Sequence, residues 1–125
     1  MYQVDIRSRI PIYEQMYENI RRLILEGHIK EDEQLPSIRE LASLLTVNPN
    51  TIQKAFKQLE QDGYIYALQG RGNFAKKLDI QYRNQEIEGI KLKLKETILE
   101  AKLLNVSLEI LSDYLIEVYK RGENR

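Results

Sequence analysis

Apolar residues recur at intervals of three and four in three short stretches of the first half of the chain, which predicts three amphipathic helices. The first stretch begins after Pro11 and ends before Gly27, and glycine often terminates helices. The polar residues 30–34 predict a loop before the second stretch. The predicted inner faces are Ile12, Met16, Ile20, Leu23 and Ile24, then Ile38, Leu41, Ala42 and Leu45, then Ile52, Ala55, Phe56 and Leu59.

The second and third helices have clear start signals. Residues 37–40 read Ser-Ile-Arg-Glu, the pattern of a capping box, in which the serine and glutamate side chains each bond a backbone N–H. Asn48 is a favoured N-cap, and Pro49 is favoured at the first helical position because its missing N–H costs nothing there. Only Thr46 and Val47 separate the two helices, so we expect them to meet at a sharp angle.

A β-hairpin is predicted after the third helix. Aromatic and β-branched residues at 64–68 and 73–75 flank a Gln-Gly-Arg-Gly turn at 69–72. Three helices, a tight turn between the last two and a following hairpin make a winged helix-turn-helix, whose third helix is presented to a DNA major groove. We therefore assign residues 1–77 to a winged helix-turn-helix DNA-binding domain.

The pattern changes after about Asp79, where two further amphipathic helices are predicted. Residues 105–107 interrupt the helical pattern, and Ser107 can cap the last helix. Two such helices bury little on their own, so we expect residues 78–125 to form a helical dimerisation region, with residues 82–88 as the linker. A core within one chain is the alternative use of these apolar stripes. The predicted dimerisation residues are Ile87, Ile90, Leu94, Ile98, Leu108, Leu111, Leu115 and Val118.

Charge is balanced over the whole chain but not along it. Lys and Arg number 19, Asp and Glu number 19, and the net charge is zero, which excludes nucleic-acid binding by bulk charge alone. Residues 34–77 hold six basic and three acidic side chains, a local charge of +3. A dimer would double the phosphate contacts of this segment.

The outer face of the third helix is rich in amides and lysines. Asn50 and Gln53 can pair with adenine through two hydrogen bonds, while Lys54 and Lys57 can reach guanine or phosphate. At the hairpin tip, Gly70 and Gly72 allow close approach of the backbone to DNA, and Arg71 suits the negative potential of a narrow minor groove.

Other classes of function find little support in the sequence. The chain has no cysteine and a single histidine, His28, so no thiolate metal site or Ser-His-Asp set can be assembled. Acidic residues of the C-terminal part alternate with lysines, as on solvated helix faces. We expect neither catalysis nor a cofactor. The charged N-terminus and the absence of an apolar run of roughly 20 residues favour a cytoplasmic protein with no membrane segment.

The fragments at 11–13 (PIY), 35–42 (LPSIRELA) and 70–74 (GRGNF) together resemble the GntR family of bacterial transcription regulators, and 47–52 (VNPNTI) resembles its YtrA-type subfamily. The resemblance covers about the first 75 residues. It implies a mainly α-helical repressor that binds a palindromic operator as a homodimer, while a small-molecule effector stays open. It also implies DNA contacts by Ser37, Arg39, Asn48, Asn50, Thr51, Gln53 and the tip Gly70, Arg71 and Gly72.

One departure from the family pattern limits what the resemblance transfers. Many relatives have an arginine where this chain has Pro49, so the recognised DNA sequence does not carry over. A winged helix that binds only protein is the alternative function. Such domains often lose the basic face, which Lys54, Lys57 and Arg71 retain here.

Overall fold

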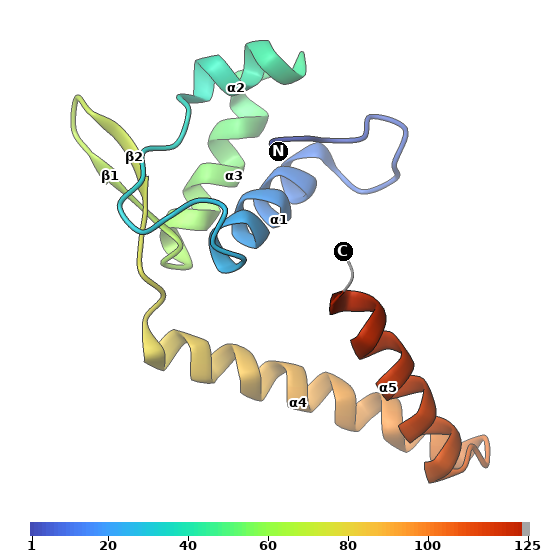
Figure 1. Cartoon of the computed structure of the whole chain (residues 1–125). Coiled ribbons are helices and arrows are strands. Elements are labelled where there is room, and N and C mark those ends of the chain that lie inside the picture. The colour runs from blue at the N-terminus through green and yellow to red at the C-terminus, as the bar shows by residue number, and fades with distance from the viewer. Residues whose placement is uncertain (124–125) are drawn as a thin grey trace. The chain divides into compact units, whose positions relative to one another are not determined.

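The computed structural model describes residues 1–123 and confirms a mainly helical fold with a two-stranded wing (Figure 1). The chain divides into two compact units, residues 1–82 and 83–125. The elements are α1 (Ile12–Leu25), α2 (Ile38–Leu45), α3 (Pro49–Gln61), β1 (Ile65–Leu68), β2 (Gly72–Ala75), α4 (Ile80–Leu103) and α5 (Leu108–Glu123).

The core of the N-terminal unit forms around α3, which packs against α1, α2 and β1. Ile52 and Leu59 of α3 are 0% exposed, and the predicted inner face of this helix is buried throughout. Ile29 and Leu35, which lie outside the predicted helices, are also buried. The core residues are Met16, Ile20, Leu23, Ile29, Leu35, Leu41, Ala42, Ile52, Ala55, Phe56, Leu59, Tyr64, Ile65 and Ala75.

Local hydrogen bonds fix the starts of α2 and α3 as predicted. The Ser37 hydroxyl accepts from the Glu40 N–H at 3.0 Å, and the Glu40 carboxylate accepts from the Ser37 N–H at 3.4 Å. The Asn48 side chain accepts from the Asn50 N–H at 2.8 Å. Thr46 ends α2 with a left-handed backbone (φ 56°), which turns the chain sharply toward α3.

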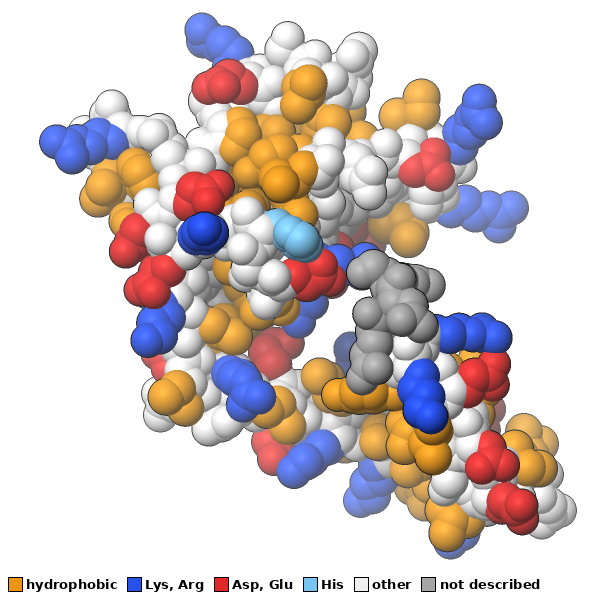
Figure 2. All heavy atoms as spheres, viewed as in Figure 1, with side chains coloured by type: hydrophobic (Ala, Val, Ile, Leu, Met, Phe, Trp, Pro, Cys, Tyr) orange, Lys and Arg blue, Asp and Glu red, His pale blue; other side chains and the backbone are white. Residues whose placement is uncertain are grey.

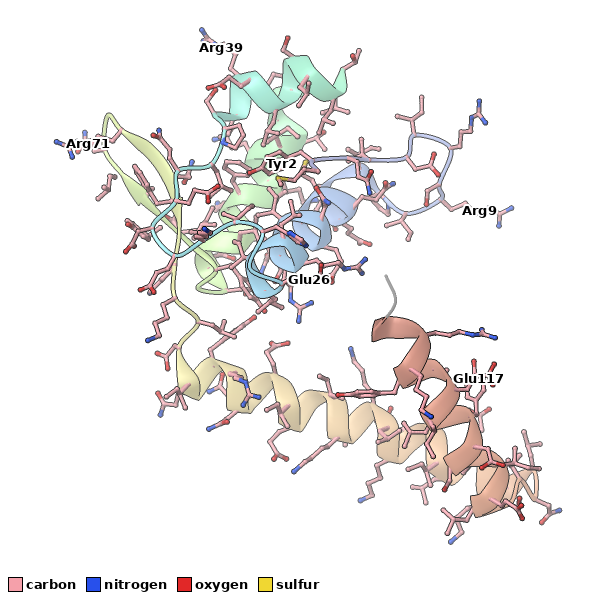
Figure 3. The ribbon with its side chains drawn as sticks, in the orientation of Figure 1. Tyr2, Arg9, Glu26, Arg39, Arg71 and Glu117 are labelled. Carbon is pink, nitrogen blue, oxygen red and sulfur yellow. The ribbon has the colours of Figure 1, made fainter. Side chains whose placement is uncertain are left out.

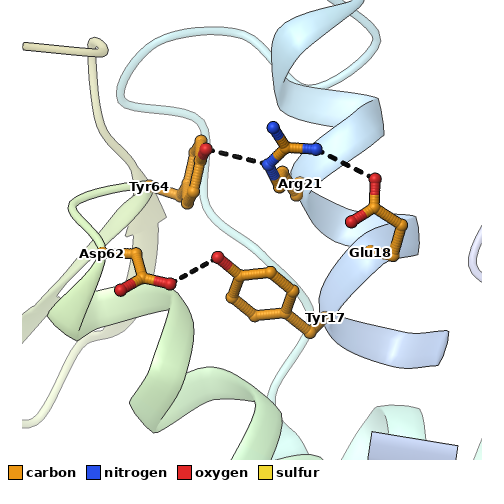
Figure 4. Close-up of polar contacts among 5 residues, drawn as sticks. All are labelled: Tyr17, Glu18, Arg21, Asp62 and Tyr64. Carbon is orange, nitrogen blue, oxygen red and sulfur yellow. Dashed lines mark hydrogen bonds and ion pairs between the residues drawn. The ribbon is translucent and has the colours of Figure 1, made fainter. Parts of the chain in front are cut away.

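A polar network ties α1 to the end of α3 (Figure 4). The Tyr17 hydroxyl donates to the Asp62 carboxylate, and Arg21 Nε donates to the Tyr64 hydroxyl at 2.8 Å. Burial, followed by the bond to Asp62, raises the pKa of Tyr17, so this phenol stays protonated as a donor. The network therefore holds the end of α3 against α1. Helical periodicity does not identify the residues that form it.

Residues 82–88, predicted to be the linker, are helical, although the two compact units do divide at this place, after Tyr82. α4 begins at Ile80, where the Asp79 side chain accepts from the Gln81 N–H at 2.7 Å. The Tyr82 ring packs edge-on against Tyr64, with ring centroids 5.5 Å apart. This contact attaches the first turn of α4 to the N-terminal unit, so the connection between β2 and α4 is shorter than the sequence suggested.

The segment predicted as a loop at residues 30–34 pairs with the wing. The Asp32 N–H donates to the Ala75 carbonyl at 2.8 Å, and the Ala75 N–H donates to the Glu33 carbonyl at 2.9 Å. Gln34 forms an antiparallel bridge with Phe74. β2 therefore has a partner on each side, which supports a hairpin that would be only marginally stable alone.

Replacing Ser37 with alanine is expected to lower the free energy of unfolding by about 1 kcal/mol, because the Glu40 N–H loses its acceptor. Urea unfolding followed by far-ultraviolet circular dichroism measures the change. Ser43→Ala, at an exposed position of the same helix, is the control and should stay within about 0.5 kcal/mol of the parent. Equal stabilities of the two variants would contradict the capping role.

Candidate nucleic-acid interface

The side of α3 opposite the core is exposed and carries the predicted base-reading residues. Asn50, Gln53, Lys54 and Lys57 are all exposed, and Thr51 is half-buried at the edge of this face. Within residues 1–123, the side chains of Asn50, Gln53 and Lys57 make no hydrogen bond or ion pair. Their polar groups are therefore available to an external partner.

Lys54 differs from its neighbours because it has a partner in α1. Its ammonium nitrogen lies 3.7 Å from the centroid of the Tyr13 ring, a cation–π contact. Tyr13 is the second residue of α1, so the start of that helix lies beside the outer face of α3. The sequence pattern gives no sign of this contact, because the two residues are 41 positions apart.

The start of α2 adds a second group of exposed polar residues. Arg39 is exposed and has no ion pair among residues 1–123 (Figure 3). The side chains of Ser37 and Asn48 are exposed as well, but each is engaged in its own helix cap. These two residues therefore combine a structural role with a position at the surface.

The wing tip is held in place by a residue that the sequence analysis did not select. Gln34 Nε2 donates to the Arg71 carbonyl at 2.7 Å, which fixes the turn and leaves the Arg71 side chain exposed. Gly70 and Gly72 have φ angles of 75° and 112°, values that side chains disfavour. A Cβ at Gly72 would lie only 3.1 Å from Gln34 Nε2, so this glycine also permits a close approach.

Basic side chains project separately from the wing, from α2 and from the segment before α1, as the blue spheres of Figure 2 show. Figure 3 labels one in each place: Arg71, Arg39 and Arg9. Polar and apolar surface separates them. This arrangement suits contacts with a spaced array of phosphates better than a single bound anion.

The predicted dimerisation residues are mostly exposed in the single chain. Their exposed fractions range from 38% at Ile98 to 79% at Leu108, while Ile87 and Leu111 are half-buried. Three further leucines of α4 were missed. With about 3.6 residues per turn, they lie roughly opposite the predicted stripe, so α4 has two apolar sides. They are Leu92, Leu99 and Leu103.

Residues 1–123 contain no candidate metal site and no candidate membrane-spanning helix. That part of the chain contains no cluster of three or more His, Asp or Glu side chains placed to hold a metal ion. None of the described helices has the length and apolar character needed to cross a membrane.

Comparisons with known proteins agree with this geometry. The family of "Bacterial regulatory proteins, gntR family" matches residues 12–74, which include α1, α2, α3 and most of the wing. The chain is similar to the HTH-type transcriptional repressor YtrA of Bacillus subtilis (strain 168), with 40% identity over 122 residues, 94% of this chain and 92% of the relative. That similarity extends beyond the winged helix into the helical tail.

Solved structures show the same relationship. A structure titled as a transcriptional antiterminator from Listeria monocytogenes EGD-e superposes with a TM-score of 0.76 at 34% identity, covering 95% of this chain and 90% of the other. AraR(DBD), solved in complex with operator ORE1, superposes with a TM-score of 0.52 at 32% identity, covering 60% of this chain and 92% of the other.

These relationships confirm the winged helix-turn-helix fold and the prediction of a DNA-binding transcription regulator, in preference to a winged helix that binds only protein. The roles of individual side chains in DNA binding and in dimerisation stay predictions. From its sequence, its fold and its relatives, the chain belongs to the GntR family of bacterial regulatory proteins.

Proposed function

We propose that the protein is a cytoplasmic repressor that binds a palindromic operator as a homodimer and blocks transcription by occupying it. The observation that carries this proposal is the outer face of α3, where Asn50, Gln53 and Lys57 are exposed and have no partner within residues 1–123. YtrA and NagR of Bacillus subtilis (strain 168), both similar to this chain, are named as transcriptional repressors. The proposed activity is regulatory rather than catalytic.

The side chains divide between reading bases and holding the DNA backbone. In the proposed complex α3 enters the major groove, where Asn50, Thr51 and Gln53 contact base edges. Lys54 and Lys57 neutralise phosphates, and Arg39 does so from the start of α2. The N-terminal ends of α2 and α3 also face the backbone, so the caps Ser37 and Asn48 lie where a phosphate would be bound.

The wing makes the third contact in this proposal. Gly70 and Gly72 add no side chains to the tip, and the hydrogen bond from Gln34 to the Arg71 carbonyl fixes the turn. Arg71 then enters the minor groove next to the major groove that α3 occupies, where a narrow groove concentrates negative potential.

Dimerisation supplies the twofold symmetry that a palindromic site requires. The exposed apolar stripe of α4, with Ile90, Leu94 and Ile98, faces the equivalent residues of a second copy, and α5 contributes Leu108 and Leu115. Two apolar sides on α4 support this assignment, because a single neighbouring helix covers only one of them. Burial of these residues between two chains removes apolar area from water that one chain leaves exposed.

Selection of bound fragments from random duplex DNA, followed by sequencing, tests the proposal directly. An inverted repeat with half-sites about one helical turn apart, or a multiple of this, is expected from a dimer. Recovery of asymmetric or unrelated fragments would contradict the palindromic operator.

Alanine substitutions on α3 are expected to affect DNA binding differently at the amide positions and at the lysine position. Asn50→Ala or Gln53→Ala should cost about 1–3 kcal/mol and relax the preference at particular base pairs, because a base contact is lost. Lys57→Ala should weaken binding to all sequences alike, because phosphate carries no sequence information. Fluorescence anisotropy on the selected duplex and on single-base variants measures both effects.

Lys30→Ala is the control for these variants, since Lys30 is exposed but follows the far end of α1. It removes the same charge as Lys57→Ala and should leave binding nearly unchanged. An unaltered base preference in the Asn50 and Gln53 variants would contradict their assignment to base edges.

Leu94→Glu is expected to raise the dimer dissociation constant at least about tenfold, because a carboxylate would be buried between the two copies of α4. Sedimentation equilibrium of the full chain measures this constant. The control Lys95→Glu changes the charge by more, but Lys95 lies between the two apolar sides and should leave the dimer intact. A full chain that sediments as a monomer would refute the proposed assembly.

A further inference from the structure

The segment before α1 is an ordered loop rather than a loose end. Residues 5–10, here the N-terminal loop, close on the side chain of Gln15 in α1. Gln15 Nε2 donates to the Ile10 carbonyl at 2.7 Å and to the Asp5 carbonyl at 3.0 Å, and Gln15 Oε1 accepts from the Asp5 N–H at 2.7 Å. One side chain therefore fixes both ends of the loop.

Hydrogen bonds within the loop further define its conformation, and one of them engages the Asp5 carboxylate. The Asp5 carboxylate accepts from the Arg7 N–H at 2.9 Å, and the Ser8 hydroxyl accepts from the Ile10 N–H at 3.1 Å. Arg7 and Arg9 are exposed, and within residues 1–123 neither side chain has an ion pair or a hydrogen bond. The loop thus presents to solvent two guanidinium groups whose residues are separated only by Ser8.

The start of α1 brings this loop beside the outer face of α3. Tyr13 follows the loop by three residues, and its ring lies 3.7 Å from the Lys54 ammonium on that face. The nearby Glu14 carboxylate accepts from the Tyr13 hydroxyl at 3.3 Å rather than pairing with an arginine. Figure 3 shows Arg9 and Arg71 at opposite edges of the N-terminal unit, with α2 and α3 between them.

We propose that the N-terminal loop is a third DNA-contacting element, in which Arg7 and Arg9 bind backbone phosphates on the side of α3 away from the wing. The guanidinium fork matches phosphate oxygens, and a loop already ordered by Gln15 loses little conformational freedom on binding. The proposal rests on DNA binding through α3. It extends the contacted surface to both sides of that helix.

The double variant Arg7→Ala/Arg9→Ala in the full chain tests the proposal on a mixed-sequence duplex and on a duplex selected by the parent protein. Two lost phosphate contacts per chain should weaken binding to both duplexes. The loss of these contacts should also make the fall of log affinity with log salt concentration less steep, by about 1.8 per chain or about 3.6 per dimer. Anisotropy titrations over a range of salt concentrations measure both quantities.

The matched control is Arg22→Ala/Lys30→Ala, which removes the same charge from exposed positions at the other end of α1. It should keep the parent salt slope. Arg7→Lys/Arg9→Lys should keep most of the slope as well, because it retains both charges. If the alanine pair at 7 and 9 behaves like the control pair, the loop makes no phosphate contact and the proposal is overturned.

Gln15→Ala separates the order of the loop from its charge. It should weaken binding about threefold while the salt slope stays at the parent value, because both arginines remain but must be ordered on binding. An unchanged affinity in this variant would show that Gln15 does not position the loop for DNA binding. Failure of the parent protein to bind either duplex would instead overturn the proposed function itself, so the two failures are distinguishable.

Discussion

The burial of one side of α3 is the constraint on which the rest of the N-terminal unit depends. Ile52, Ala55 and Leu59 are fully buried, and each large apolar side chain so placed contributes roughly 1.5–3 kcal/mol through removal from water. A rotation of α3 about its axis would expose them, so the opposite side is fixed as the outer face. The cap at Asn48 and the bond from Tyr17 to Asp62 then hold the two ends of the helix.

The helices α4 and α5 differ from α3, because their apolar residues are mostly not buried within the single chain. α4 and α5 leave most of their large apolar side chains exposed, and charged residues fill the positions between them. Apolar residues occupy two opposite sides of α4, a pattern that one neighbouring helix cannot satisfy. The two units therefore differ: one buries an apolar core within a single chain, while the other leaves apolar residues exposed, as the proposed dimer requires.

The sequence predicted some elements correctly because their signals are local. The capping box at residues 37–40 and the Asn48-Pro49 start involve contacts within four residues, so they can be recognised without the fold. The helical conformation of residues 82–88 was not predicted because the signal there is not local. Tyr82 packs on Tyr64, and that contact, which no periodicity reveals, holds the first turn of α4.

By itself, the sequence determined the number and order of the helices, the inner face of α3 and the residue types on its outer face. These follow from helical spacing, capping chemistry and turn preferences, all of which act over a few positions. Only the tertiary structure decided which distant residues support that face. Gln34 meets Arg71 across 37 positions, and Tyr13 meets Lys54 across 41, because packing of the core places those backbones together. Such contacts depend on the folded arrangement of whole elements, so the hydrophobic spacing within one element does not predict them.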